Sequence, residues 1–520
     1  MKTVTIECSL DECDDEAVIQ KKVAKKSKLN PHKPFSYRIL KKSLDARRGR
    51  VRFHYLVQIN PPVESKASSP KALPQPDPNK GHVVVVGAGP AGLFCAYELA
   101  RHGIRSTIVD RGKDVQERRK DLKGLNQHGR VDEDSNYCFG EGGAGTYSDG
   151  KLYTRAHKRG DIRDIIEILN THGAPEKILS DARPHIGSNK LPKVIQALRQ
   201  TLEAVQCEFK FGTRVSDFIL KDQKIIGVQT KSGEELHGDA VVLATGHSAK
   251  DVYEIAEKNN VELNAKTFAL GVRIEHPQPL INEIQYRDAA GHPKLPPAAY
   301  RVAHHEGEHG AYSFCMCPGG WIVPATTTPG QVVVNGMSLS KRDSPFANSG
   351  FVVSIHPEDL EKMGYKGIWG GIKLQQDIEK IAFDQGETNL KAPAVRVTDF
   401  LENKTSTTLP KTSYIPGIVS SDLNHTFRPA GDHVASMLRR ALLQFDKKLK
   451  GYVTEDAIMV GVETRTSSPL RMERNQTTLE STRIKDLYPC GEGAGYAGGI
   501  MSAAMDGTRV ARAIHEKTNA

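Results

Sequence analysis

A run of four apolar residues, Val83–Val86, leads directly into a glycine-rich turn and then into a segment of helical character. An uninterrupted apolar run predicts a strand that is buried on both faces of a sheet. The turn covers Gly87–Gly92, and Leu93–Arg101 predicts a helix. A second strand is expected at Ser106–Val109. Strand, turn, helix and strand in this order predict a parallel α/β sheet.

The glycine spacing of this turn matches the fingerprint of dinucleotide-binding sites. Gly87 allows a tight turn, Gly89 lets the backbone approach a pyrophosphate, and Gly92 lets helix and strand pack closely. The helix N-terminus offers N–H groups and the positive end of its dipole to phosphates. An acid follows the second strand about 20 residues past the turn, where such sites bind ribose hydroxyls. The residues expected at the dinucleotide are Gly87, Gly89, Pro90, Ala91, Gly92, Asp110 and Arg111.

Later segments continue the α/β pattern. An amphipathic helix is predicted over Leu191–Gln206, and four strands follow it. A glycine-rich stretch near the C-terminus precedes a last predicted helix, Ile500–His515. The strands are predicted at Glu208–Phe211, Val215–Leu220, Ile225–Thr230 and Ala240–Gly246.

The first 60 residues predict a small α+β domain. Strands are expected at Thr3–Ile6, Ser36–Leu40 and Val51–Ile59, and a helix at Asp15–Leu29. This segment carries fourteen Lys/Arg against seven Asp/Glu, so it holds +7 of the total charge of +10. Such a basic segment fits RNA or an anionic partner, and equally a solvated helix face. Residues 61–80, with six prolines, predict an extended linker.

The stretch from Phe268 to Gly451 has a different residue pattern, with prolines and glycines between short apolar runs. We interpret it as a second α+β domain, a cap for the substrate, inserted into the first. Strands are expected at Gln331–Asn335 and Gly350–Ile355, and helices at Gly371–Phe383 and His433–Phe445. The predicted boundaries are 81–267 and 454–520 for the two parts of the dinucleotide-binding domain and 268–453 for the cap.

Composition narrows the class of protein. The chain is 38% hydrophobic and 26% charged, which is typical of a globular protein. No apolar run approaches the ~20 residues that span a bilayer, and the N-terminus lacks the apolar core of a secretory signal, so a cytoplasmic location is expected. The cysteines show no zinc-ligand spacing, and no metal site is predicted. Cys315 and Cys317 form a near pair, for which a redox role and the more common role of buried free thiols both stay open.

Three further motifs make the comparison with known families more specific. They are Phe139–Leu152, Gly461–Pro469 and Gly491–Asp506. With the first turn, they resemble the bacterial family of NAD(FAD)-utilising or FAD-dependent dehydrogenases, flavoproteins of the two-dinucleotide-binding-domain superfamily. The resemblance covers the whole chain and implies FAD in a Rossmann-like, three-layer domain of the glutathione-reductase type. No second glycine fingerprint follows a strand between Leu191 and Gly451, so any NAD(P)H is expected to bind only transiently.

The resemblance also implies cofactor contacts. The loop from Gly142 and the residues up to Leu152 would lie near the flavin, and the strand ending at Gly246 and the backbone near Val215 would meet the adenosine half. Glu492 stands where related flavoproteins place an aspartate for the ribityl chain. The N-terminus of the last helix would favour negative charge on the flavin. The implied residues are Gly142, Gly143, Ala144, Gly145, Thr146, Lys151, Leu152, Val215, Ala244, Thr245, Gly246, Gly491, Glu492, Gly498, Gly499 and Ile500.

Two side chains, Arg465 and Lys151, are candidate catalytic groups. Arg465 suits an anionic substrate or developing negative charge; if it instead pairs with Glu463, both are structural. Asp149 is expected beside Lys151 at the ring or the substrate.

The sequence thus favours an FAD-dependent oxidoreductase that moves a hydride between flavin N5 and a small organic substrate. Two alternatives stay open: a flavoprotein that modifies RNA through its basic N-terminal domain, and a non-catalytic nucleotide-binding or docking protein. The aromatic residues of that domain fit a core as well as an RNA surface; they are Phe35, Tyr37, Phe53 and Tyr55.

Overall fold

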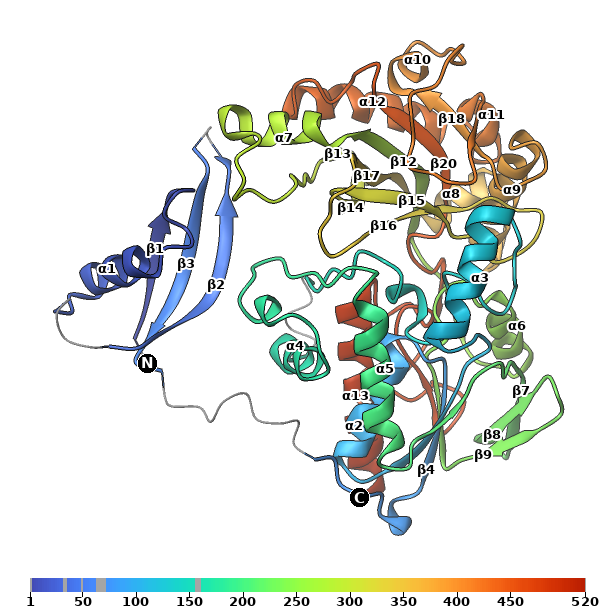
Figure 1. The fold of residues 1–520 in the computed structure, drawn as a ribbon. Helices are drawn as coiled ribbons and strands as arrows, with labels where there is room; N and C mark the ends of the chain where they lie inside the picture. Colours follow the sequence, from blue (N-terminus) through green and yellow to red (C-terminus); the bar gives the residue numbers. More distant parts are fainter. Residues whose placement is uncertain (1, 31–34, 48–49, 62–71, 155–159, 520) are drawn as a thin grey trace.

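The computed structural model describes residues 2–30, 35–47, 50–61, 72–154 and 160–519, and Figure 1 shows their arrangement. A small N-terminal domain lies at one side of the molecule. Its antiparallel sheet has the strand order β1-β3-β2, and one helix packs against it. The elements, which confirm the predicted order, are β1 (Thr3–Cys8), α1 (Glu16–Ser27), β2 (Tyr37–Asp45) and β3 (Arg52–Ile59).

The alternation of apolar residues along β3 builds the core of this domain. Phe53 and Tyr55 point inward against α1 and are almost completely buried. The outer strand β2 hydrogen-bonds to residues 180–182 of the main body. Within the predicted linker, residues 62–71 lie outside the described residues, and a single 3-10 turn, Pro78–Lys80, precedes the next strand.

A five-stranded parallel sheet forms the centre of the second domain, with the order β22-β10-β4-β5-β6. Its central strand carries the apolar run of the sequence, and alternate valines face opposite sides. Val83 and Val85 pack against helices, whereas Val84 and Val86 belong to the core on the other face. The strands are β4 (His82–Val86), β5 (Arg105–Val109), β6 (Glu208–Lys210), β10 (Ala240–Leu243) and β22 (Leu487–Pro489).

Different layers cover the two faces of this sheet. One face packs against α2 (Pro90–Arg101), α4 (Ile162–Thr171), α5 (Leu191–Glu203) and α13 (Ile500–Thr518). The other packs against α6 (Lys250–Lys258) and an antiparallel sheet of β7 (Val215–Lys221), β8 (Lys224–Thr230) and β9 (Glu235–His237). The mixed α/β fold is therefore confirmed, while its assignment to the glutathione-reductase type stays a prediction.

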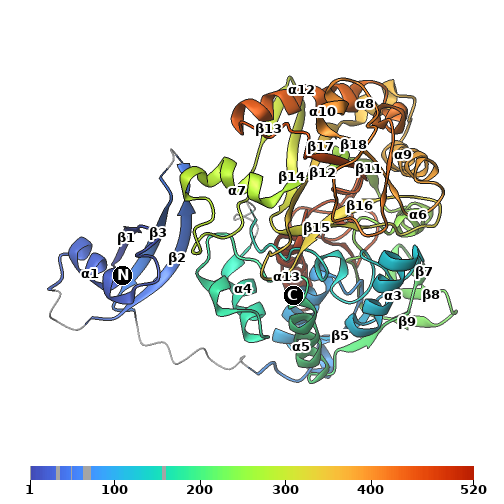
Figure 2. The ribbon, with the colours of Figure 1, turned by 45° about the horizontal axis from the view of Figure 1, so that its top comes forward.

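The cap is built on a seven-stranded sheet with the order β13-β14-β17-β12-β20-β18-β19. Figures 1 and 2 show it above the parallel sheet, with the hairpin β15–β16 between them. Its strands are β12 (Phe268–Pro277), β13 (Ala303–Glu306), β14 (His309–Cys317), β15 (Gly320–Pro324), β16 (Val334–Ser338), β17 (Phe346–Ile355), β18 (Ala392–Arg396), β19 (Ile418–Ser420) and β20 (Ile458–Glu463).

Helices and short elements complete the chain. They are α3 (Val115–His128), α7 (Gln278–Tyr286), α8 (Pro357–Lys362), α9 (Gly370–Gln385), α10 (Val397–Leu401), α11 (Leu423–Thr426) and α12 (His433–Lys448), with the strand pair β11 (Leu263–Ala265) and β21 (Leu470–Met472). The predicted helices of the cap are confirmed as α9 and α12. No helix among the described residues is long and apolar enough to cross a membrane.

Two predictions about the cap need correction. We assigned residues 454–520 to the dinucleotide-binding domain, but β20 pairs with β12 and β18 inside the cap sheet, so the chain leaves the cap only after Glu463. We also expected a strand at Gln331–Asn335, whereas β16 begins at Val334, because its register is set by antiparallel pairing with β15. Both differences arise from pairing with distant strands.

Helix α13 crosses α2 at a glycine, and this contact is testable. A Cβ on Gly507 would lie 2.0 Å from the Ala91 carbonyl oxygen, so Gly507→Ala forces the helices apart. We expect it to lower the free energy of unfolding by about 1–3 kcal/mol, measured by chemical denaturation. Gly124→Ala in α3 is the matched control, because its Cβ meets nothing nearer than 3.9 Å. The control should gain up to ~1 kcal/mol from helix propensity; equal effects of the two changes would contradict this packing.

Candidate functional site

The turn between β4 and α2 contains two kinds of glycine, those that pack against protein atoms and one that faces open space. A Cβ on Gly92 would lie 1.9 Å from the Gly87 carbonyl oxygen, so this residue allows the close packing predicted from the sequence. Gly87 has φ +109°, and a Cβ there would lie 2.4 Å from the Ala244 carbonyl oxygen. Gly89 differs, because its Cβ would meet only the Gly143 Cα at 3.9 Å. Its backbone faces open space, at the N-cap of α2.

This space is one end of a cavity of about 530 Å³ that extends from the turn to the cap. Most residues predicted at the cofactor line it. They are Gly87, Gly89, Pro90, Ala91, Asp110, Arg111, Gly143, Ala144, Gly145, Lys151, Val215, Ala244, Thr245, Gly246, Glu492, Gly498, Gly499 and Ile500, joined by the catalytic candidate Arg465. A volume of this size is typical of small-molecule and cofactor sites.

Five predicted residues stand behind the wall of the cavity instead. Gly92 packs as described, and the Gly491 N–H donates to Asp506 at 2.8 Å. Thr146 is fully buried and donates its hydroxyl proton to the Glu141 carbonyl, and a Cβ on Gly142 would collide with it. Leu152 belongs to the core beneath the helices. These residues, Gly92, Gly142, Thr146, Leu152 and Gly491, support the site rather than line it.

The backbone forms a cradle along the cavity. Cβ atoms on Gly246, Gly498 and Gly499 would meet no protein atom within 4 Å, as at the open face of Gly89. The N-termini of α2 and α13 both border this space, and each leaves N–H groups without partners in its own helix. An elongated ligand with phosphates and a planar electron-rich end fits such a cradle.

Asp110 fixes the shape of the phosphate end. One carboxylate oxygen accepts the Ala88 N–H at 2.8 Å, and the other accepts those of Gly112 and Gly140 at 2.8 and 3.0 Å. A carboxylate offers about four acceptor positions, which leaves room for a ribose hydroxyl. Arg111 lies over the Phe139 ring and pairs with Asp251.

A buried arginine that the sequence analysis did not identify shapes the glycine loop. Arg118 of α3 has no exposed surface, and its guanidinium donates to four main-chain carbonyls at 2.8–2.9 Å. Those carbonyls belong to Asn136, Tyr137, Glu141 and Gly143. The spacing of the sequence contains no signal for this role, because an arginine in an amphipathic helix is normally exposed.

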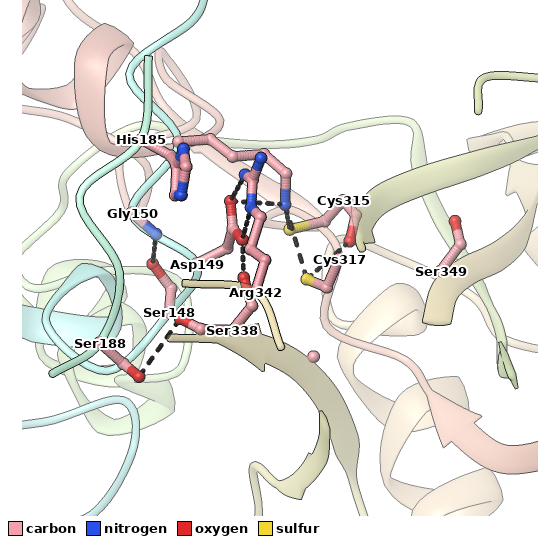
Figure 3. A network of polar contacts seen from close by, with 12 residues as sticks. Ser148, Asp149, Gly150, His185, Ser188, Cys315, Cys317, Ser338, Arg342 and Ser349 are labelled. Carbon is pink, nitrogen blue, oxygen red and sulfur yellow. Dashed lines mark hydrogen bonds and ion pairs between the residues drawn. The ribbon is translucent and has the colours of Figure 1, made fainter. Parts of the chain in front are cut away.

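At the cap end, a polar network joins the two domains (Figure 3). Asp149 is buried and accepts hydrogen bonds from Ser338 and Arg342. The Lys151 Nζ lies 3.4 Å from its carboxylate, 3.6 Å from the Cys315 Sγ and 3.5 Å from the Cys317 Sγ. Burial alone would lower the pKa of Lys151, but the two sulfurs and the carboxylate outweigh burial and raise it. Lys151 is therefore a charged group at the cavity wall.

The alternative pairing of Arg465 with Glu463 is wrong. Its guanidinium bonds to Glu379 of α9, with Nε and Nη2 at 2.9 and 2.8 Å from the carboxylate oxygens, and not to Glu463. Glu463 instead pairs with Arg273 of β12 at 3.1 Å, and burial raises its pKa to about 7. Glu463 is the last residue of β20 and Arg465 lies beyond this strand, so only the cap fold determines which distant charge each one meets. Arg465 as an anion clamp stays a prediction.

A histidine cluster on the cap lies apart from the cavity. Ring nitrogens of His309 and His433 and a carboxylate oxygen of Asp359 lie within 4.8 Å of one another. The His309 Nε2 and Asp359 already hydrogen-bond at 2.9 Å, and the His433 Nε2 hydrogen-bonds to the Ser354 carbonyl. The cluster is satisfied by protein partners, and we assign no metal to it.

Comparisons with known proteins found matching family models and similar solved structures. Residues 80–129 match a family model described as an FAD binding domain, and residues 267–466 match one described as the C-terminal domain-like part of an FAD-dependent protein. Residues 1–60 match a domain of unknown function. Similar solved structures include the tetracycline destructase Tet(51) (13% identity, 86% of this chain and 84% of that chain, TM-score 0.35) and the flavin-dependent brominase Bmp2 (14%, 84% and 80%, TM-score 0.37).

A relative in Clostridium beijerinckii, described as an uncharacterized protein, is 40% identical over 538 residues, which covers 98% of each chain. Identity at this level over both whole chains includes the N-terminal domain, the dinucleotide-binding domain and the cap. The chain belongs to the family of this Clostridium protein, and its matched domains make it an FAD-binding flavoprotein.

Proposed function

We propose that the protein is an FAD-dependent oxidoreductase of the dehydrogenase type, which moves a hydride between flavin N5 and a small organic substrate under the cap. The observation that carries this proposal is the single cavity that joins the turn at Gly87–Ala91 to the cap residues Cys315, Asn335 and Arg465. A cofactor in the cradle and a substrate under the cap would share one space, as two-electron transfer requires.

The residues of the cavity fit the parts of FAD in order. The N-terminus of α2 would hold the diphosphate, with Asp110 at the adenosine ribose. The walls at Val215 and at 244–246 offer an apolar and backbone surface for the adenine. The N-terminus of α13 would face the pyrimidine edge of the ring, where its dipole favours negative charge. When bound, the flavin supplies a site that accepts or donates an electron pair.

The cap supplies the substrate side. Phe314, Asn335 and Lys151 all line the cavity, so they offer an organic molecule there an aromatic ring, an amide and a cation. Lys151 would orient an electron-rich substrate group and hold its own protons, since its pKa is raised. The cap strands above would exclude water from the reaction.

The electron donor we propose is NAD(P)H, bound only transiently. The chain has one glycine fingerprint after a strand, at Gly87–Gly92, and the cradle there would be filled by FAD. A pyridine nucleotide would then enter the substrate side, react and leave.

RNA modification is the alternative, but Phe53 and Tyr55 lie in the core of the N-terminal domain, which removes them as stacking surfaces for bases.

The cradle can be tested at Gly89. The Cβ of a valine there would lie in the cavity, with the Gly143 Cα at 3.9 Å as its only protein neighbour within 4 Å, so we expect Gly89→Val to fold as the wild type does. We expect its FAD dissociation constant to rise at least about tenfold, or ~1.4 kcal/mol, measured by quenching of flavin fluorescence. The thermal midpoint of the apoprotein should not change, and Gly124→Ala should bind FAD normally. Full occupancy by the yellow chromophore in Gly89→Val would show that the cofactor lies elsewhere.

The donor can be tested by anaerobic mixing. NADH or NADPH should bleach the bound flavin completely, with a rate that saturates at high nucleotide concentration. Gel filtration of the reduced protein should leave FAD bound and no stoichiometric pyridine nucleotide, because binding is transient. A flavin that dithionite reduces but neither nucleotide reduces would contradict NAD(P)H as the donor.

A further inference from the structure

Cys315 occupies an unusual position in the cap sheet. The pairing of β14 with β17 shifts by one residue between Phe314 and Cys317, which is a β-bulge. Cys315 lies in this bulge with φ +44°, a left-handed conformation that favours glycine. Bulges next to active sites commonly re-aim a side chain, and Cys315 is the residue of this bulge that lines the cavity. A non-glycine residue held in this conformation points to a function for its side chain.

The second cysteine lies directly behind the first. Cys317 is fully buried, and its thiol donates to the Cys315 carbonyl at 3.3 Å. Both sulfurs approach the same Lys151 nitrogen, within 3.6 Å. The pair thus combines a thiol at the cavity wall with a buried thiol one residue away.

We propose that Cys315 and Cys317 form a dithiol–disulfide pair that exchanges two electrons with the FAD in the cavity. This inference rests on the proposed function and adds a redox site to it. In the forward direction, the anionic reduced flavin gives two electrons and its N5 proton to the Cys315–Cys317 disulfide. The S–S bond breaks, the Cys317 thiol and the Cys315 thiolate form, and oxidised FAD remains, so no further reactant is needed.

The charges around the pair divide the roles of the two sulfurs. The neighbouring Cys317 thiol, followed by the charges of Lys151 and Arg273, holds the pKa of Cys315 well below its ordinary value despite burial. The neighbouring Cys315 sulfur, together with burial, raises the pKa of Cys317. Cys315 is therefore the thiolate that reacts at the cavity, and Cys317 is the thiol that closes the disulfide.

The position relative to the cradle agrees with this role. Cys315 lines the same cavity as Glu492 and as Gly499 and Ile500 at the N-terminus of α13. The proposed flavin ring would occupy that end. A disulfide across a single intervening residue is strained, which makes it easier to reduce. The pair therefore suits an electron acceptor for a reduced flavin.

The first experiment examines the thiols without the cofactor. Apoprotein is treated with the thiol oxidant diamide, alkylated and analysed by peptide mass spectrometry. We expect a Cys315–Cys317 disulfide in the wild type. We also expect iodoacetamide to alkylate Cys315 at pH values where an ordinary thiol, with a pKa of about 8.5, is protonated. If both cysteines remain fully alkylatable after diamide, the pair does not form and the proposal fails.

The second experiment counts electrons in the holoenzyme. Diamide-oxidised, desalted wild type should need two equivalents of a two-electron donor in an anaerobic dithionite titration, one for FAD and one for the disulfide. Cys315→Ser and Cys317→Ser should need one. Cys315→Gly should also need one, and it should fold well because glycine is favoured at this φ. Cys207→Ser is the matched control, since Cys207 is a free cysteine outside the cavity, with its sulfur hydrogen-bonded to Ser106, and it should need two.

The outcomes separate the two proposals. A protein that takes up no FAD contradicts the proposed function, whereas the disulfide measured in the apoprotein is unaffected. A flavin that is reduced normally, with one equivalent consumed by both the wild type and the cysteine variants, overturns the dithiol pair alone.

Discussion

One carboxylate and one guanidinium hold together the loops on which the cavity depends. Asp110 accepts main-chain N–H groups from both the Ala88 turn and Gly140, and Arg118 donates to four carbonyls of the glycine loop and the segment before it. Both groups are buried. If one of these hydrogen bonds were missing, a charged group would stay without a partner away from water, which costs free energy. The two walls of the cradle are thus fixed before a ligand arrives, and binding is spared the entropy of ordering them.

The parts of this site that the sequence predicted are those with local causes. Gly92 is required by a contact within one turn, because its Cβ would collide with the Gly87 carbonyl, and the spacing of these two glycines is therefore readable in the chain. The apolar run of Val83–Val86 predicted a strand covered on both faces, since each valine must find a core on its own side. The resemblance to a known family, and not a local contact, indicated Gly498 and Gly499 at the start of the last helix, and Cβ atoms there would meet no protein atom within 4 Å.

The remaining features depend on residues far apart in the chain. Arg465 meets Glu379 and Arg273 meets Glu463 only after β12, β20 and α9 have packed together. The predicted end of the cap was wrong for the same reason. The sequence of β20 is that of any buried strand, and only its pairing with β12 assigns it to the cap sheet. No local pattern reveals that Arg118 points inward, or that a bulge turns Cys315 toward the cavity.

Charge balance at the cap end connects these features with the chemistry. Arg273 has Glu463, and Arg342 has Asp149, so Lys151 shares a carboxylate that is already paired. A buried cation in this position is stabilised by any further negative charge nearby. A thiolate at Cys315 supplies one such charge, and an anionic reduced flavin at the N-terminus of α13 would supply another. The cap therefore stabilises the electron-rich states of its site, and the same lysine couples the sulfur pair to the cofactor side of the cavity.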